Sequence, residues 1–255
     1  MQGLNIAGTR LECRWFGPGA EQVPTLVLLH EGLGCVELWK GFPQRLAAVT
    51  GLGVFVYSRA GYGRSDPVTL PRPLSYMHHE GLEVLPAVLD AVGVRQAILV
   101  GHSDGASIAL INAGGVRDPR VIGAVLMAPH VFNEPLCVDS IRAARDAYAE
   151  GGLRAALARY HADVDGAFWG WNRAWLDSDF LSWNIEKYLP DIAIPLLVIQ
   201  GEGDEYGTAA QVESIQRQVN APVEVRWLAS CRHSPHRDQP QQTLAAIAGF
   251  VQRPL

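Results

Sequence analysis

Residues 101–105 read Gly-His-Ser-Asp-Gly, a pattern that can present a serine as a nucleophile. An apolar run, 98–100, precedes it, and a segment suited to a helix, 106–110, follows it. Glycines on both sides of Ser103 permit a sharp turn between strand and helix, which directs the hydroxyl toward a substrate. The N–H of Asp104 would begin the helix, where the helix dipole favours an oxyanion. The segment predicts a nucleophile, Ser103, and an oxyanion donor, Asp104; an ordinary Gly/Ser turn is the alternative.

A serine is a weak nucleophile at neutral pH unless a base takes its proton, and histidine has a suitable pKa for that role. The histidine in turn needs an acid that fixes its tautomer and stabilises the imidazolium. Asp204 and His233 each follow a predicted strand, and the order Ser, Asp, His along the chain suits such a group. We therefore predict a catalytic triad of Ser103, Asp204 and His233. His236, in the same loop as His233, is the competing base.

A second glycine-containing loop directly follows the apolar run 25–30. Residues 31–34 of this loop read Glu-Gly-Leu-Gly. A backbone N–H at such a position can approach the nucleophilic serine and help to bind an oxyanion. We predict that Gly32 supplies the second donor of an oxyanion hole, beside Asp104; the N–H of Leu33 is the alternative donor.

Glu31 places a carboxylate next to this predicted hole. A negative charge there would repel the oxyanion that forms during the reaction, so it must be turned away, neutralised or paired with a cation. We expect an ion pair with Arg59 or Arg64, which lie in the loop after the next predicted strand. In the alternative interpretation, Glu31 contacts the substrate or positions the hydrolytic water.

Apolar segments alternate with segments of helical spacing along most of the chain. The predicted strands are 9–16, 25–30, 54–58, 98–100, 121–128, 195–200 and 223–228. The predicted helices are 38–49, 82–92, one after Ser103, one that opens on a capping-box pattern at 208–211, and a final one that includes 244–251. This alternation implies right-handed crossovers and predicts an α/β fold, with a mostly parallel sheet flanked by helices.

The alternation stops between 130 and 194, where the sequence shows helical spacing and is rich in aromatic residues. A loop of this length without secondary structure is improbable, so we predict a helical cap inserted into the core. The predicted division is a core of 1–129 and 195–255 and a cap of 130–194. The cap would cover the carboxyl ends of the strands, where open α/β sheets bind ligands. Substrate contacts are expected from Glu31, Leu33, His102 and Trp171.

These motifs resemble the α/β-hydrolase superfamily over nearly the whole chain, in the serine turn, the inserted cap and the triad order. Local phrases at 30–34, 58–63 and 233–240 are similar to those of small capped bacterial serine esterases and meta-cleavage-product hydrolases. The resemblance implies an α/β-hydrolase fold and aligns His233 with the catalytic base. The chain departs from the family pattern at Glu31 and Arg232, where glycine is common.

The composition excludes several classes of protein. Of 255 residues, 48% are hydrophobic, which suffices for one domain with an insertion. A formal net charge of −5 leaves no basic stripe and argues against nucleic acid as a partner. No run approaches 18 apolar residues and the first residues do not suit a signal peptide, so we expect no membrane partner and a cytoplasmic location. Four scattered cysteines lack metal-binding spacing, and no metal or organic cofactor is expected.

We expect a serine hydrolase that cleaves a small, largely apolar carboxylic ester, lactone or thioester through an acyl-enzyme. The close alternative is hydrolysis of a carbon–carbon bond in an aromatic-degradation product of the meta-cleavage type, which requires cations for substrate carboxylates. The cap offers Arg142, Arg145, Arg159 and Arg173. A ligand receptor and a cofactor-free oxygenase are further alternatives. A haloalkane dehalogenase is disfavoured, because its nucleophile would be aspartate. A small molecule is the expected partner, and monomer or homodimer stays open.

Overall fold

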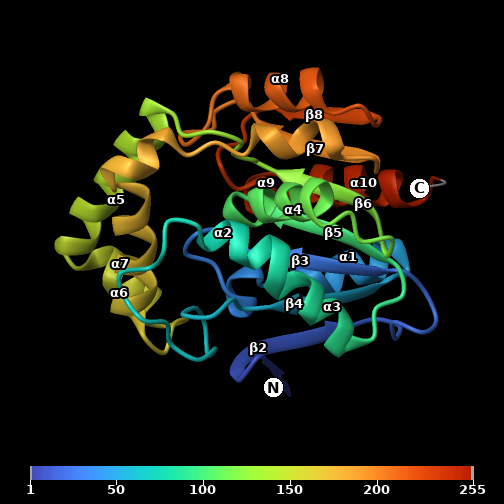
Figure 1. The fold of residues 1–255 in the computed structure, drawn as a ribbon, viewed down its shortest axis with the longest axis horizontal. Coiled ribbons are helices and arrows are strands. Elements are labelled where there is room, and N and C mark those ends of the chain that lie inside the picture. Colours follow the sequence, from blue (N-terminus) through green and yellow to red (C-terminus); the bar gives the residue numbers. More distant parts are fainter. Residues whose placement is uncertain (1, 254–255) are drawn as a thin grey trace.

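An eight-stranded sheet runs through the molecule in a computed structural model, which describes residues 2–253 (Figure 1). The strands lie in the order β1-β2-β4-β3-β5-β6-β7-β8. The pairs β1/β2 and β2/β4 are antiparallel, and all other neighbours are parallel. The strands are β1 (Gln2–Ile6), β2 (Thr9–Phe16), β3 (Thr25–Leu29), β4 (Gly53–Tyr57), β5 (Ala97–His102), β6 (Val121–Met127), β7 (Leu196–Gly201) and β8 (Val223–Leu228). The predicted mostly parallel sheet is confirmed.

Helices cover both faces of this sheet. They are α1 (Phe42–Thr50), α2 (Tyr76–His79), α3 (Leu85–Val92), α4 (Asp104–Gly115), α8 (Ala209–Gln218), α9 (Pro235–Asp238) and α10 (Pro240–Val251). Because alternate residues of a strand point to opposite faces, Leu26 and Leu28 of β3 join the apolar cluster under α1 and α10. Val27 and Leu29 join the cluster under α3, α4 and α8. All of β3 is buried, as a strand covered on both faces requires.

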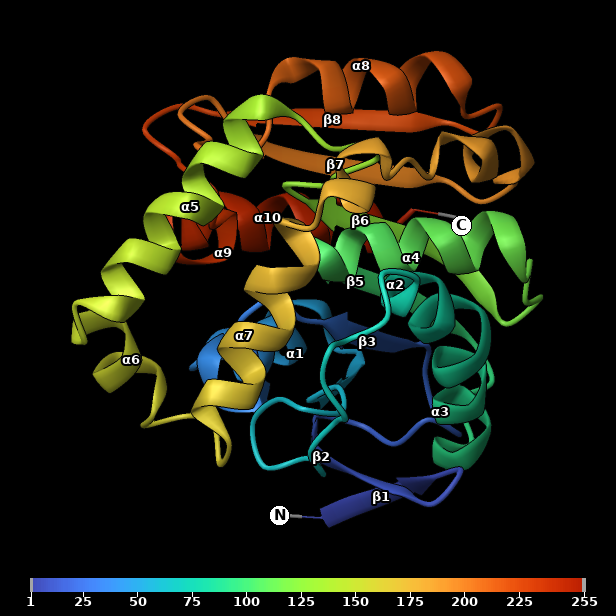
Figure 2. The ribbon, with the colours of Figure 1, turned by 60° about the vertical axis from the view of Figure 1, so that its left-hand side comes forward.

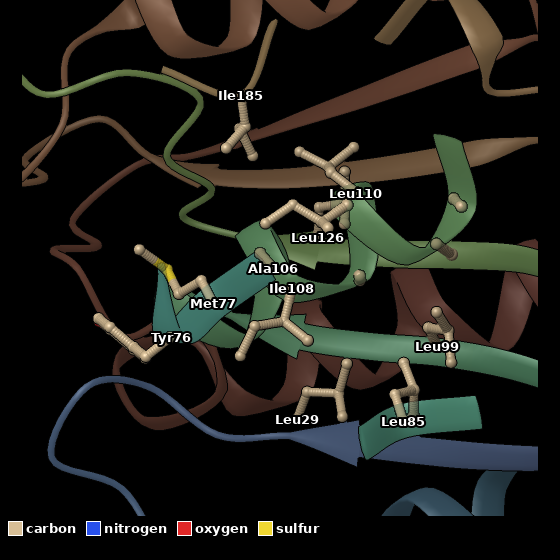
Figure 3. Close-up of a cluster of buried hydrophobic side chains, with 14 of the residues drawn as sticks. Leu29, Tyr76, Met77, Leu85, Leu99, Ala106, Ile108, Leu110, Leu126 and Ile185 are labelled. Carbon is tan, nitrogen blue, oxygen red and sulfur yellow. The ribbon is translucent and has the colours of Figure 1, made fainter. Parts of the chain in front are cut away.

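Helix α4 lies in the middle of the second cluster. Its residues are buried on every side, which explains why its sequence is apolar without an amphipathic pattern. Figure 3 shows Ile108 and Leu110 of this helix among Leu29, Leu99 and Leu126 of three neighbouring strands. The turn between β5 and α4 is therefore held between two rigid, fully packed elements.

The segment between β6 and β7, residues 130–194, is called the cap segment. It contains α5 (Pro135–Ala149), α6 (Gly152–Leu157), α7 (Val164–Trp175), η3 (Ser178–Ser182) and η4 (Glu186–Asp191). Figure 2 shows α5, α6 and α7 beside the sheet. Ser140 Oγ donates to the carbonyl of Glu205 after β7, and the Ala162 N–H donates to the carbonyl of Gly63 after β4. The cap segment thus contacts the carboxyl ends of the strands, and its treatment as a separate unit remains a prediction.

Some local predictions differ from the structure. The predicted helix over 38–49 is divided into two. The first part, η1 (Val36–Trp39), stops before Lys40, whose φ of 53° is left-handed, and α1 begins at Phe42. The predicted helix over 82–92 begins earlier, with α2 and the π-helix η2 (Glu80–Val84), and Pro86 falls in the first turn of α3. Strand β1 was not predicted. Short irregular helices follow from tertiary packing, which periodicity does not report.

The capping box predicted at the start of α8 forms only in part. Thr208 accepts a hydrogen bond from the Ala210 N–H, as an N-cap residue does. The side chain of Gln211 instead accepts from the Val131 N–H and donates to the Phe132 carbonyl. Gln211 therefore ties the start of the cap segment to α8. Within residues 2–253, no helix is long and apolar enough to cross a membrane.

Candidate active site

Ser103 occupies the turn between β5 and α4. Its backbone has φ of 53° and ψ of −119°, a conformation that costs free energy for a residue with a Cβ. A Cβ on Gly101 would overlap the backbone of Gly105, and a Cβ on Gly105 would overlap the carbonyl of Leu29. Both flanking glycines are therefore required by close backbone approach. Ser103 is only 7% exposed, so the turn presents its hydroxyl in a nearly closed site.

His233 connects Ser103 to Asp204. Its Nε2 lies 3.0 Å from Ser103 Oγ, and its Nδ1 lies 2.8 Å from Asp204 Oδ1. A carboxylate only accepts, so Nδ1 carries the proton and Nε2 accepts from the serine hydroxyl. The three residues follow β5, β7 and β8, whose carboxyl ends share one edge of the sheet. This arrangement can remove the serine proton during an attack on a carbonyl.

The carboxylate of Asp204 has three donors besides His233. The N–H groups of Tyr206 and Gly207 donate to Oδ1 at 2.8 and 3.3 Å, and Gln200 Nε2 donates to Oδ2 at 2.7 Å. Burial raises the pKa of Asp204, but the hydrogen bond and charge of His233 and the Tyr206 N–H lower it by more, to well below its ordinary value. Asp204 is therefore ionised at neutral pH and can stabilise an imidazolium at His233.

His236 lies beside this group without joining it. Its ring is 3% exposed and packs with centroid distances of 4.8 Å to Trp39 and 5.5 Å to Phe42. Neither ring nitrogen has a hydrogen-bond partner among the residues that the structure describes. Burial and the nearby His102 hold the pKa of His236 well below its ordinary value, so its ring is neutral. The structure places His233, and not His236, against Ser103.

Two side chains fix the peptide group between Glu31 and Gly32. Arg59 Nη2 donates to the Glu31 carbonyl at 3.1 Å, and His30 Nδ1 lies 2.7 Å from the same oxygen. Because His30 Nε2 accepts from the Arg59 N–H, the His30 proton is on Nδ1 and is donated to that carbonyl. In a trans peptide the N–H points opposite to the carbonyl, so these bonds set the direction of the Gly32 N–H. They also polarise the peptide, which strengthens that N–H as a donor.

Trp171 of α7 covers this loop. A Cβ on Gly32 would overlap the indole Nε1, so glycine is required for the close contact between loop and cap segment. The half-buried Leu33 lies next to it, and its carbonyl is 3.0 Å from Nε2 of His161 in the cap segment. Two of the predicted substrate contacts, Leu33 and Trp171, thus lie where the cap segment meets the predicted oxyanion loop.

Glu31 is paired, but not with the predicted Arg59 or Arg64. Its Oε2 lies 3.4 Å from His102 Nδ1, and its Oε1 lies 3.4 Å from Arg237 Nη2. The predicted partners are wrong, because the guanidinium of Arg59 is used by backbone carbonyls of the oxyanion loop. Burial raises the pKa of Glu31, but His102 and Arg237 lower it by more, to well below its ordinary value.

His102 links Glu31 to the loop that carries His233. Its Nε2 lies 2.7 Å from the carbonyl oxygen of His233, so the ring donates to the backbone of that loop. The side chain is 1% exposed, which leaves little surface for the predicted contact with a substrate. The pair Glu31–His102 therefore stabilises the position of the His233 backbone.

We expect Glu31→Gln to lower stability more than turnover. The amide keeps the size of the side chain but loses the charge that pairs with His102 and Arg237, at a cost on the order of 1–3 kcal/mol. The folded-state pKa is depressed, so the contribution of the carboxylate is present above the ordinary value of 4.5 and disappears as pH falls below it. At pH 8 the melting temperature should fall while kcat changes less than about tenfold. Thermal denaturation and kinetics of one preparation measure both.

Glu37→Gln is the matched control for this change. Glu37 pairs with Arg14 at the surface, and surface pairs contribute only about 0–1 kcal/mol. The control should lose less thermal stability than Glu31→Gln. A large loss of kcat at an unchanged melting temperature would instead place Glu31 in the reaction.

The side chain of Asp104 is committed to the protein interior. The Tyr76 hydroxyl donates to its Oδ2, and Arg59 Nη2 lies 4.0 Å from the same oxygen. Trp175 of the cap segment donates to the Tyr76 hydroxyl at 3.1 Å. Burial raises the pKa of Asp104, and Arg59 opposes that shift. The backbone N–H of Asp104, at the first position of α4, is the group that can face an oxyanion.

With this geometry established, comparison with known proteins gives the family. Residues 26–247 match the model of the alpha/beta hydrolase family. The chain belongs to the α/β-hydrolase family. The enol-lactonase from Burkholderia xenovorans superposes with a TM-score of 0.77 over 99% of this chain and 100% of that chain, at 17% identity, which shows the fold alone. The predicted superfamily and fold class are thus confirmed.

Two curated relatives of this α/β hydrolase match about the same share of the chain. Epoxide hydrolase B of Mycobacterium tuberculosis is 35% identical over 108 residues, which is 42% of this chain and 29% of that enzyme. The 2-hydroxy-6-oxononadienedioate/2-hydroxy-6-oxononatrienedioate hydrolase of Paraburkholderia phymatum is 30% identical over 122 residues, 47% of this chain and 40% of that enzyme. Each match spans less than half of the relative.

Two rings beside His233 of this α/β hydrolase are absent from the predicted site. The ring centroids of His130 and Tyr206 lie 5.6 and 4.6 Å from that of His233. Each follows a strand, β6 or β7, and this position is the signal that could have identified them. Burial and the neighbouring His233 lower the pKa of His130 to about 3, so it is neutral. Although several histidines gather at this edge of the sheet, no group of three or more His, Cys, Asp or Glu within the described chain could hold a metal ion.

Three buried histidines, His30, His130 and His236, make the folded protein sensitive to acid. Burial lowers each pKa from the ordinary value of 6.5. The unfolded chain therefore binds protons that the folded chain does not, and stability is complete above pH 6.5 and falls as pH decreases below it. For His130, whose folded-state pKa of about 3 lies below this whole range, the difference amounts to about 2 kcal/mol between pH 7 and pH 5. We expect urea denaturation to show that the free energy of unfolding falls by at least about 2 kcal/mol between pH 7 and pH 5.

His236→Phe is the matched variant for this pH effect. Both nitrogens of His236 lack partners among the described residues and its ring packs on Trp39 and Phe42, so phenylalanine suits the site. The variant should lose less stability than the wild type between pH 7 and pH 5, because its unfolded chain lacks the proton that His236 binds in the unfolded wild type. If the wild type were as stable at pH 5 as at pH 7, or more stable, this result would contradict the buried, neutral state of these histidines.

Proposed function

We propose that this α/β hydrolase cleaves a small, largely apolar carboxylic ester, lactone or thioester through a serine acyl-enzyme. The supporting observation is the continuous hydrogen-bonded chain from Ser103 through His233 to Asp204, with distances of 3.0 and 2.8 Å. The contact between Trp171 and Gly32 sets an aromatic ring over the proposed oxyanion hole, which favours an apolar substrate.

Acylation follows from these positions. Ser103 Oγ attacks the carbonyl carbon, and its proton passes to Nε2 of His233 while ionised Asp204 stabilises the imidazolium. The N–H groups of Gly32 and Asp104 donate to the oxyanion of the tetrahedral intermediate. When the intermediate collapses, the bond to the leaving oxygen or sulfur breaks. His233 returns its proton to that atom. An alcohol or thiol then departs from an ester or thioester, whereas a lactone opens and keeps its new hydroxyl on the acyl group.

Deacylation repeats the same steps with water as the nucleophile. His233 takes a proton from a water molecule, whose oxygen attacks the acyl carbon on Ser103. The oxyanion again accepts from the proposed hole. Collapse breaks the bond between the acyl carbon and Ser103 Oγ, which recovers its proton from His233. The products are a carboxylic acid and the original enzyme.

The similarity to an epoxide hydrolase does not lead to a proposal of that activity. Attack of Ser103 Oγ on an epoxide would form an ether, which has no carbonyl for water to attack, whereas a carboxylate nucleophile would form a hydrolysable ester. The neighbouring carboxylate of Asp104 already accepts from Tyr76 and lies beside Arg59. The chemistry of Ser103 therefore favours acyl transfer.

Carbon–carbon bond hydrolysis is a second candidate, favoured by the similarity to the Paraburkholderia phymatum hydrolase of a dioate. A substrate with two carboxylates would need cations close to the triad. The four arginines offered by the sequence for this role are exposed, and two of them pair with neighbouring aspartates. They are Arg142, Arg145, Arg159 and Arg173, with Asp139 and Asp146 as the partners. Ester cleavage is thus the better supported function.

A substrate panel tests the two candidates. It contains p-nitrophenyl esters of graded acyl length, matched lactones and thioesters, and a vinylogous diketone. We expect turnover of the short and medium esters, and hydroxylamine should trap the acyl group as a hydroxamate. A higher kcat/KM for the diketone than for every ester would favour carbon–carbon hydrolysis. No turnover of any ester, lactone or thioester would overturn the proposal.

A further inference from the structure

A separate cavity of about 610 Å³ lies between the antiparallel edge of the sheet and helices α2 and α3. Its walls come from β1, β2, the loop before α2, and the continuous helix α2-η2-α3. The described residues that line it do not include Ser103, Asp204 or His233. Cavities of this volume commonly hold small organic molecules. The cavity is therefore distinct from the proposed active site and large enough for a ligand.

Two buried charged side chains stand in this otherwise largely apolar lining. Arg72 is 7% exposed and Glu80 is 5% exposed. Glu80 Oε2 has no hydrogen-bond partner within residues 2–253, and an unsatisfied buried acceptor costs on the order of 1–3 kcal/mol. The apolar residues of the lining include Ile6, Leu11, Ala60, Val68, Val84 and Ala87. Because Glu80 and Arg72 line the same cavity, a ligand with an apolar body and one polar group complements this lining.

The surrounding charges favour a neutral head group. Burial raises the pKa of Glu80, and the positive charges of Arg59 and Arg72 oppose that shift. The positive charges of Arg59 and Arg72 would repel an ammonium group placed beside Glu80. A carboxylate ligand would in turn be repelled by Glu80. A carboxamide or a hydroxyl is neutral and carries both a donor, which suits Glu80, and an acceptor, which suits Arg72.

Tyr76 connects this cavity with the turn that carries the nucleophile. It lies on α2 next to Met77 (Figure 3) and lines the cavity. Its hydroxyl donates to the Asp104 carboxylate. The guanidinium carbon of Arg72 lies 5.3 Å from the centroid of the Tyr76 ring, so a ligand that contacts Arg72 also lies close to this ring. His79 and Glu83 line the cavity with exposed side chains and mark its mouth. Binding free energy at the cavity can therefore be coupled to the proposed oxyanion donor Asp104.

We propose that this cavity is a second binding site, for a small neutral molecule with an apolar body and one carboxamide or hydroxyl group, and that its occupancy changes turnover at Ser103. The effect on turnover rests on the proposed function. Binding itself does not, because it can be measured without any reaction.

Isothermal calorimetry with three probes of one shape tests the site. Benzamide carries a neutral head group that donates and accepts, benzoate an anion, and benzylamine a cation. We expect benzamide to bind the wild type at least about tenfold more tightly than either ion. Benzoate lacks the donor for Glu80 and benzylamine lacks the acceptor for Arg72, so each ion loses one hydrogen bond. Ala87→Phe fills the cavity and should weaken benzamide binding at least about tenfold. Ala143→Phe, on the exposed face of α5, is the matched control and should bind as the wild type does.

The outcomes separate the parts of the proposal. Equal benzamide affinity in Ala87→Phe and in the wild type would overturn the location, and tighter binding of benzoate or benzylamine would overturn the neutral head group. If Ala87→Phe does not fold, Val84→Phe fills the same cavity from the neighbouring turn. Saturating benzamide should change kcat for an ester at least about twofold in the wild type and not in the filled variant. An unchanged kcat would overturn the coupling, whereas failure of the proposed function shows as absence of ester turnover before benzamide is added.

Discussion

Ser103→Ala should lower kcat for the best ester by at least about three decades. The change removes the atom that is proposed to form the acyl-enzyme, and the remaining groups could then only bind the substrate and polarise its carbonyl. The fold should tolerate it, because alanine is smaller and, among the described residues, the hydroxyl makes a single hydrogen bond, to His233. We expect the melting temperature to stay within a few degrees of the wild type. Kinetics and thermal denaturation of the same preparation check both statements.

Ser107→Ala is the matched control for the nucleophile. Ser107 lies about one helical turn further along α4 and is also buried, but its hydroxyl donates to the His130 carbonyl instead of to His233. Its removal should lower stability by about 1 kcal/mol and leave kcat within about threefold of the wild type. A serine-directed phosphonate should label Ser103 alone in the wild type. Retention of half the activity by Ser103→Ala would eliminate the serine mechanism.

The sheet and the grouping of the triad could be predicted because both follow from local patterns. Continuous apolar runs mark strands that are covered on both faces, and loops after parallel strands meet at one edge of the sheet. Ser103, Asp204 and His233 each follow such a strand, so their meeting required only the strand assignment. The choice of His233 over His236 depended on the family resemblance, because the two lie three residues apart in one loop.

The partners of the charged residues could not be predicted in this way. Glu31 pairs with Arg237, which lies 206 positions along the chain, because the loop after β8 returns beside the loop after β3. Arg59 was assigned to Glu31 on sequence proximity, but the unsatisfied carbonyls of the oxyanion loop bind its guanidinium more directly. Pairing of this kind is decided by which buried polar groups lack other partners, and a linear pattern does not contain that information.

The second cavity could not be predicted from the sequence either, because it depends on how several elements pack together. It depends on β1, a strand that was not predicted, and on η2, a π-helix within a segment where a regular helix was expected. Glu80 appears in the sequence as one of many acidic residues. Its burial without a partner for Oε2 among the described residues is what distinguishes it. A cavity is an absence of side chains, so it becomes visible only when all the neighbouring elements are placed.

His233→Ala should be as damaging as Ser103→Ala, with a loss of at least about three decades in kcat. His233 holds two hydrogen bonds that define its role, one from Ser103 Oγ and one to Asp204. Without the imidazole, no group accepts the serine proton, so labelling by the phosphonate should also slow in parallel. Because the serine and the histidine act as one unit, the double variant should be no worse than either single variant. Added imidazole should restore part of the activity of His233→Ala and none of Ser103→Ala.

The comparison with His236 decides whether this assignment is correct. His236 has the same side chain three residues away, and its ring lies 4.9 Å from the ring of His102, which supports the loop that carries His233. Its nitrogens lack partners among the described residues, so His236→Phe removes no hydrogen bond and should keep kcat within about threefold of the wild type. His236→Ala should instead lower stability by about 2–4 kcal/mol, because it leaves a cavity between Trp39 and Phe42. If His236→Phe lost three decades of kcat while His233→Ala remained active, the base would be His236 and the proposed proton path would be wrong.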